Sequence, residues 1–87
     1  MPPETLLKFP CEFPIKALGR ADEGFEILVA TIVRQHARDL GEGAVRSRPS
    51  RGGKYLAVTV QVRATSREQL DAIYQGLHAE PRVVMVL

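Results

Sequence analysis

The sequence predicts an α+β sandwich in which a four-stranded antiparallel sheet carries two helices on one face. Three observations indicate this fold class. Apolar residues alternate with polar residues at 9–18 and 55–64, as in strands, and recur at helical spacing at 22–40 and 70–77. The pair Gly52-Gly53 marks a hairpin turn. The 87 residues are enough for one small core and too few for two.

The first strand is predicted within residues 9–18, where every odd position from Phe9 to Ala17 is apolar. Pro10 and Pro14 donate no hydrogen bond to a neighbouring strand. We therefore expect regular pairing to begin at or just after Pro14 and to run to Leu18. Residues 1–7 are expected to form a loose N-terminal arm, and residues 8–87 a single domain.

The first helix is predicted within residues 22–40, with Asp22 as its cap and with Gly41 and Gly43 ending it. His36 lies on or beside its apolar stripe, and Cys11 lies on the apolar face of the first strand. We expect both to be packed side chains. The stripe consists of Phe25, Leu28, Val29, Ile32, Val33 and Leu40.

The middle of the chain predicts a hairpin around Gly52-Gly53. With these two glycines as the loop, Arg51 faces Lys54, and a four-residue loop over 51–54 gives the same register. Apolar residues then face apolar residues, and polar residues face polar ones. The register opposes Val45 to Val60, Ser47 to Val58, Pro49 to Leu56, Arg46 to Thr59, Arg48 to Ala57 and Ser50 to Tyr55.

The second helix is predicted to begin at one of two overlapping capping boxes, Thr65 with Glu68 or Ser66 with Gln69. Its apolar stripe is Leu70, Ile73, Tyr74 and Leu77. Residues 82–87 form the last strand. The order strand, helix, strand, strand, helix, strand predicts a ferredoxin-like βαββαβ sandwich with strand order 4-1-3-2. One sheet face stays uncovered and displays Arg46, Arg48, Thr59, Gln61 and Arg63.

The sequence gives little support for an enzyme, a membrane protein or a bound cofactor. Cys11 has no neighbouring histidine, and His36 and His78 fall in different predicted helices without metal-ligand spacing, so we expect no catalytic residue and no metal site. The longest apolar run, 83–87, is far shorter than the about 20 residues of a membrane helix. The start of the chain lacks the regions of a signal peptide, and the lone cysteine favours a reducing compartment. We expect a cytoplasmic protein.

Positive charge is concentrated in the middle of the chain. The formal net charge is +2, yet residues 44–67 hold six Arg or Lys residues and no acid. Arginine and glycine amides at a hairpin tip can bind an anion, although a solvated turn explains the same residues. The candidate binding residues are Arg46, Arg48, Ser50, Arg51, Gly52, Gly53, Lys54 and Tyr55. A second interpretation is an RNA- or DNA-binding module, but Tyr55 is the sole aromatic residue on its strand.

Four segments resemble the YbeD-like family of small bacterial proteins of unknown function: FPCEFPIK (9–16), RPSRGGKYL (48–56), ATSREQLDAIY (64–74) and VMVL (84–87). The resemblance implies a fold similar to ACT-type regulatory domains and an association with lipoate metabolism. ACT domains admit an effector at a glycine-containing turn, and residues 18–22 offer Gly19 without the usual Pro-Gly pair. We therefore expect a non-enzymatic regulatory or adaptor domain that contacts a protein partner or a small anionic metabolite. A homodimer through the open sheet face is also expected.

Overall fold

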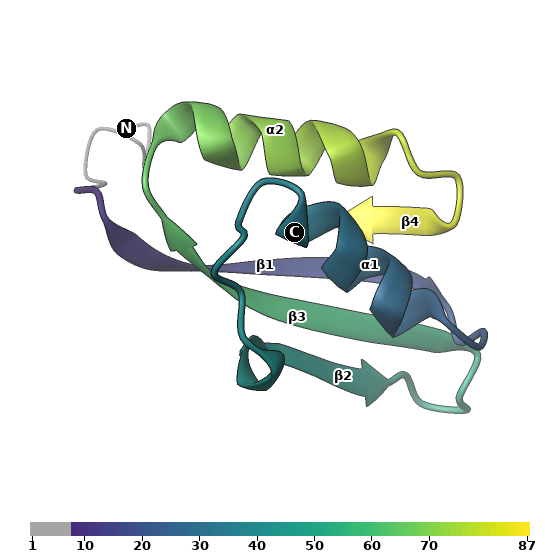
Figure 1. Cartoon of the computed structure of the whole chain (residues 1–87). Coiled ribbons are helices and arrows are strands. Elements are labelled where there is room, and N and C mark those ends of the chain that lie inside the picture. The colour runs from purple at the N-terminus through teal and green to yellow at the C-terminus, as the bar shows by residue number, and fades with distance from the viewer. Residues whose placement is uncertain (1–7) are drawn as a thin grey trace.

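A computed structural model describes residues 8–87, so the predicted arm over 1–7 lies outside the described residues. The sheet order is β2-β3-β1-β4, which confirms the predicted order, and all neighbouring strands are antiparallel. Both helices cover one face of the sheet (Figure 1), and no element within residues 8–87 covers the other face, called the uncovered face below. The elements are β1 (Cys11–Arg20), α1 (Phe25–Arg34), the 3₁₀ turn η2 (Glu42–Ala44), β2 (Val45–Pro49), β3 (Tyr55–Ala64), α2 (Arg67–His78) and β4 (Val83–Val86).

The core lies between the sheet and the two helices. The even residues of β3 and the odd residues of β1 face the helices, as the alternation predicted, and the predicted stripe residues of both helices pack against them. No polar or charged side chain is buried in the described part of the chain. The largest fully buried side chains are Phe25, Ile15, Ile73, Leu77, Val29, Val33, Val58, Val60 and Val62.

The hairpin has the predicted register and the longer of the two predicted loops. All five predicted pairs from Val45 with Val60 to Pro49 with Leu56 are formed. The Ser50 amide donates to the Tyr55 carbonyl at 2.8 Å, and the Gly53 amide donates to the Ser50 carbonyl at 2.9 Å. Gly52 and Gly53 have φ values of 85° and 76°, which side-chain-bearing residues adopt only at a cost. The loop therefore spans residues 51–54.

β1 begins earlier and ends later than predicted. It begins earlier because Pro14 does not interrupt its pairing. It pairs with β3 from Cys11 to Arg20. The Lys16 amide donates away from β3, to the Leu87 carbonyl at 3.2 Å, so the Pro14 nitrogen two residues earlier points to the same side. β4 does not extend to Pro14, and no hydrogen bond is lost there. Pro49 in β2 is tolerated for the same reason. The next residue, Ser50, donates its amide to β3, so the Pro49 nitrogen faces the outer edge of the sheet, where no strand needs a donor.

The predicted bounds of the first helix are wrong at both ends. Gly24, with a φ of 84°, precedes the first turn, and Asp22 supplies its backbone carbonyl to the Phe25 amide instead of a side-chain cap. The helix ends at Arg34, well before Gly41 and Gly43, because the chain must cross from the helix layer to the outer edge of the sheet to begin β2. His36, which was expected to be packed, is exposed in this crossing segment.

The second helix confirms the predicted boundary and decides between its two capping boxes. The Ser66 hydroxyl accepts a hydrogen bond from the Gln69 amide at 3.1 Å, and the Gln69 side-chain oxygen accepts one from the Thr65 amide at 2.8 Å. The Gln69 side-chain nitrogen also donates to the His36 carbonyl at 2.8 Å. One side chain thus joins the start of α2 to the crossing segment after α1.

Candidate functional site

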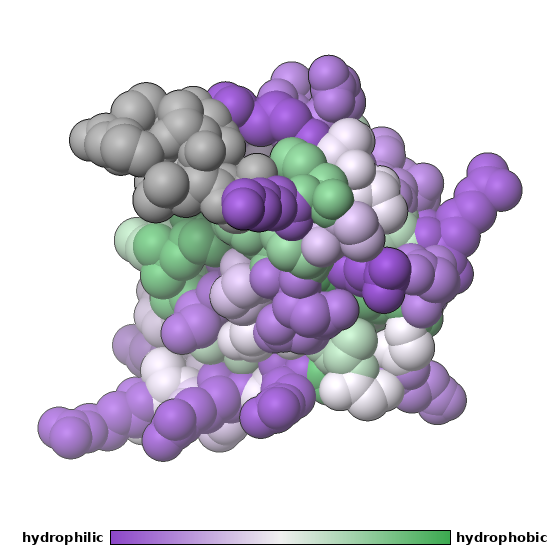
Figure 2. Space-filling view, turned by 90° about the vertical axis from the view of Figure 1, so that its left-hand side faces the viewer, coloured by the Kyte–Doolittle hydropathy of each residue, from purple (hydrophilic) through white to green (hydrophobic). Residues whose placement is uncertain are grey.

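The uncovered face of the sheet concentrates positive charge. Strand pairing and the alternation of side chains place five cations on this face against one acid in the described part of the chain. The cations are Lys16, Arg20, Arg46, Arg48 and Arg63, and the acid is Glu12. Figure 2, which views the end of the molecule where β1 begins, shows hydrophilic side chains along its lower edge, where β2 lies in Figure 1. The sequence predicted three of these cations, those from β2 and β3, to lie together.

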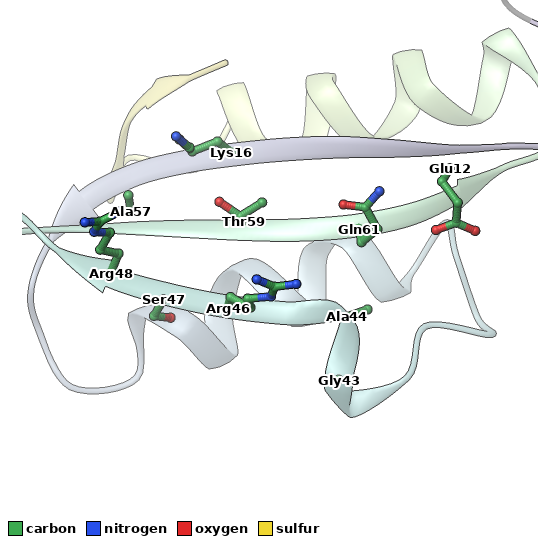
Figure 3. Close-up of a pocket in the computed structure, with 10 residues that line it drawn as sticks. All are labelled: Glu12, Lys16, Gly43, Ala44, Arg46, Ser47, Arg48, Ala57, Thr59 and Gln61. Atoms are coloured by element: carbon green, nitrogen blue, oxygen red, sulfur yellow. The ribbon is translucent and has the colours of Figure 1, made fainter.

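A hollow of about 700 Å³ lies on this face. Short side chains on β3, Ala57 and Thr59, form its floor, and longer side chains on the flanking strands form its walls (Figure 3). The pairings place Lys16 and Arg46 on either side of Thr59, in one row across three strands. Arg48 lies beside Ala57 in the next row. Three cationic side chains therefore surround the same small area of sheet.

The hollow is polar along its length. Glu12 lies at the end away from Lys16 and Arg48, and Gln61 lies between them (Figure 3). Within residues 8–87, the side chains of Glu12, Lys16, Arg46 and Arg48 have no hydrogen bond and no ion pair. Their charges are exposed to solvent and remain available to a ligand.

The predicted hairpin residues separate into two sets. Arg46 and Arg48 line the hollow, whereas residues 51–54 form the loop beyond it. The Ser50 hydroxyl accepts a hydrogen bond from the Tyr55 amide at 3.0 Å, and the Gly53 amide donates one to the Ser50 carbonyl. Of the two glycine amides expected to face an anion, the one at Gly53 is therefore occupied. The tip has the hydrogen bonds of an ordinary tight turn.

Lys16 and Glu12 belong to the hollow, although sequence reasoning did not include them. The signal was present, since the apolar odd positions of β1 direct its even positions to the opposite face. The predicted strand order also places β1 directly beside β3. Combining these two predictions would have assigned both side chains to the uncovered face.

The other chemically versatile side chains are dispersed. Cys11 is half-buried and packs against the core, as expected, and His36 and His78 are exposed on different segments. Across residues 8–87, no group of three or more His, Cys, Asp or Glu side chains is placed to hold a metal ion. The same residues contain no helix that is both long and apolar enough to span a membrane. Burial raises the pKa of the Tyr74 hydroxyl in α2.

Comparisons with known proteins find close relatives of the whole chain. The model of a family described as "Protein of unknown function (DUF493)" matches residues 4–87. The chain is 45% identical over 87 residues to UPF0250 protein NE1487 of Nitrosomonas europaea, covering 100% of both chains. It is 49% identical over 84 residues to a UPF0250 protein of Paraburkholderia phytofirmans, covering 97% of this chain and 94% of the relative.

A solved structure shows the same fold at low sequence identity. The solution structure of protein HP0495 from H. pylori matches with a TM-score of 0.74 and 14% identity. The match covers 100% of this chain and 94% of the other. The likeness extends over the sheet and both helices, so it supports the predicted α+β architecture.

Proposed function

Since the chain belongs to the DUF493 family of proteins of unknown function, in keeping with the predicted YbeD-like resemblance, we propose its role from its surface. It is a non-enzymatic regulatory or adaptor domain that binds an anionic group on the uncovered sheet face. The observation that carries this proposal is the hollow in which Lys16, Arg46 and Arg48 surround Thr59 and Ala57. Arginine suits this task because its planar fork grips carboxylate or phosphate with two hydrogen bonds.

The chemistry of the hollow favours binding over catalysis. Its described lining includes one carboxyl group, Glu12, and neither histidine nor cysteine. A nucleophile needs an activating base within hydrogen-bond reach, and within residues 8–87 no side chain is hydrogen-bonded to Glu12. The anionic group belongs to a small metabolite or to an acidic segment of a partner protein. The association of YbeD-like proteins with lipoate metabolism makes carboxylates of that pathway the first metabolites to test.

The charge of the face also bears on a homodimer. Five cations against one acid on each copy would bring like charges together if two copies met face to face. An anionic ligand neutralises this surface, whereas a second copy does not. We therefore place the homodimer second to an anionic partner on this face. Sedimentation at tens of micromolar checks this order, because a stable dimer that loses none of its affinity at low salt would contradict it.

Nucleic acid remains the alternative anionic partner. Tyr55 is 39% exposed and pairs with Arg20 in the register, so one aromatic ring and several cations share the face. Single-stranded nucleic acid binding usually stacks successive bases on several aromatic rings. Binding of RNA and DNA oligonucleotides should be measured over a range of salt concentrations. Tight binding that weakens steeply with salt would favour this alternative, and no binding at low salt would reject it.

The proposal is tested by removing charge from the hollow without changing the fold. Arg46→Gln/Arg48→Gln should lower affinity for anionic metabolites by about tenfold or more, because each charged hydrogen bond is worth about 1.5 kcal/mol or more. The matched control is Arg34→Gln/Arg38→Gln, which removes two exposed cations away from the uncovered face. Calorimetric titration against carboxylates and phosphates, together with affinity capture from the native cell, gives the readout. Equal loss in both variants would contradict the site.

A further inference from the structure

We infer that the ligand of this hollow is bipolar, with a phosphate monoester at one end and an ammonium group roughly 10 Å away at the other. The strand positions that would hold the two groups are about 13 Å apart, and their side chains can reach toward a ligand between them. The inference rests on the proposed function, since it takes the hollow as the binding site. It adds the class of ligand, which follows from the arrangement of charges along the sheet.

The phosphate end is defined by the row that contains Lys16, Thr59 and Arg46. Neighbouring strands lie about 4.8 Å apart, so two long cationic side chains flank a hydroxyl at a separation that both can bridge. The Thr59 hydroxyl can donate to the same anion, and Arg48 approaches from the next row. Three cations exceed what one carboxylate neutralises. A phosphate monoester, with a charge of about −1.5 to −2 at neutral pH, matches them better.

The ammonium end is defined by Glu12. It lies four residues along β1 from Lys16, which corresponds to about 13 Å between their Cα atoms. Within the described residues its carboxylate has no ion pair, and the neutral Gln61 separates it from the three cations of the hollow, Lys16, Arg46 and Arg48. A second anionic group on the ligand would meet this carboxylate and be repelled. An ammonium group there would gain an ion pair instead.

Arg63 is the group most able to compete for Glu12. The two residues are paired in the register, and both line a smaller neighbouring hollow of about 250 Å³. Arg63 does not line the larger hollow, and the two side chains are not within ion-pair distance in the described structure. Glu12 can therefore turn its charge toward a ligand in the larger hollow, and removing Arg63 should strengthen that contact.

Two pairs of probes test the inference. The long pair is 6-aminohexyl phosphate and hexyl phosphate, which differ in the ammonium group at the far end. The short pair is 2-aminoethyl phosphate and ethyl phosphate, whose ammonium group cannot reach Glu12 from Thr59. Calorimetric titration at low salt should show that the protein prefers the long aminated probe by about two- to fivefold, the usual contribution of an exposed ion pair. The short pair should show no preference.

Variants separate the two ends of the hollow. Glu12→Gln should abolish the preference within the long pair and leave the affinity for hexyl phosphate unchanged or higher. Arg46→Gln should weaken both long probes by a similar factor, and Arg63→Gln should keep or increase the preference. Circular dichroism confirms that each variant is folded.

The outcomes distinguish this inference from the proposed function. Equal binding of the two long probes by the wild-type protein, or a preference that survives Glu12→Gln, overturns the inference but leaves anion binding intact. Failure of the wild-type protein to bind either long probe, while it binds a carboxylate or another phosphate, also overturns the inference alone. Failure to bind any carboxylate or phosphate at all overturns both.

Discussion

At the scale of single residues, Gly19 determines how β1 meets the first helix. It lies against the ring of Phe25, the largest fully buried side chain, and the Arg82 guanidinium lies over the same ring at 5.9 Å from its centroid. A Cβ at this position would clash with Phe25 Cζ and would lie 2.6 Å from the Arg82 carbonyl oxygen. ACT-type domains admit an effector at a turn like the one that contains Gly19, although this turn lacks their usual Pro-Gly pair. Close packing is a sufficient reason for glycine here.

Gly19→Ala should therefore lower the free energy of unfolding by about 1 to 3 kcal/mol, the usual cost of overpacking a core. Urea denaturation measures the change. Gly41→Ala is the matched control, because a Cβ there meets nothing within 4 Å and the backbone is extended, with a φ of −88°. A cost as large for Gly41→Ala as for Gly19→Ala would show that the effect is not steric.

Tyr74 gives the protein a specific sensitivity to alkaline pH. Burial raises the pKa of its hydroxyl above the ordinary 10.0, so the unfolded chain releases this proton at a lower pH than the folded chain does. The free energy of unfolding should then fall as the pH rises above about 10. Urea midpoints near pH 8 and above pH 10 should show a smaller fall in Tyr74→Phe than in the wild type. An identical fall in both would count against this cause.

At the scale of elements, strand pairing and the second helix were predictable because short-range chemistry decides them. The hairpin register followed from the turn and from alternation, and the start of α2 followed from Ser66 and Gln69. The bounds of β1 and α1 were missed for a different reason. The effect of Pro14 depends on whether a neighbouring strand reaches it, and the end of α1 depends on where the chain must go next. The effect of Pro14 and the end of α1 both depend on the tertiary structure.

Ser66→Ala should destabilise the domain by about 1 kcal/mol, because it leaves the Gln69 amide without its cap. Thr65→Ala is the comparison, since it removes only the hydroxyl's hydrogen bond to the Gln69 side-chain oxygen at 3.2 Å and retains the bond from the Thr65 amide, so a smaller loss is expected. Thermal unfolding of the two proteins gives the comparison. If both variants lose equal stability, the Ser66 hydroxyl is not the cap that matters.

The loop of the hairpin should tolerate side chains poorly. Gly52→Ala and Gly53→Ala should each cost about 1 to 2 kcal/mol, because both residues have positive φ. Gly43→Ala, which adds a Cβ in open space without a positive φ, is the control. The midpoints of urea denaturation of the three variants and the wild type measure these costs. A neutral result at both loop positions would mean that the turn readily adopts another conformation.

At the scale of the whole molecule, the uncovered face brings together residues from three strands that are far apart in sequence. The hairpin register and the strand order predicted five residues on it, namely Arg46, Arg48, Thr59, Gln61 and Arg63. Lys16 and Glu12 were missed because placing them needs two predictions combined, the alternation of β1, which directs its even positions to this face, and the pairing of β1 with β3, which brings them beside the hairpin. Two of the predicted binding residues, Arg46 and Arg48, line the hollow, whereas residues 51–54 of the predicted tip do not. That these residues bind a ligand stays a prediction.

The cations of this face should oppose folding when salt is low. Raising the ionic strength from about 0.01 M to about 0.1 M shortens the Debye length from about 30 Å to about 10 Å and screens their repulsion. The gain in unfolding free energy should be smaller in Arg46→Gln/Arg48→Gln than in the wild type, and Arg34→Gln/Arg38→Gln should resemble the wild type. Thermal unfolding of the three proteins at both ionic strengths measures this gain in stability. Equal gains in all three proteins would mean that the face carries no unusual repulsion.

The outward nitrogen of Pro49 affects how the protein behaves in a crowded solution. An edge strand with regular amides can accept a strand from another molecule, and such additions can continue into fibrous aggregates. Pro49 offers no donor at that edge, and the cations of β2 repel an approaching copy. The hairpin that supplies two arginines to the hollow therefore also limits sheet growth on this side, so charge-removing variants should be compared for aggregation as well as for binding.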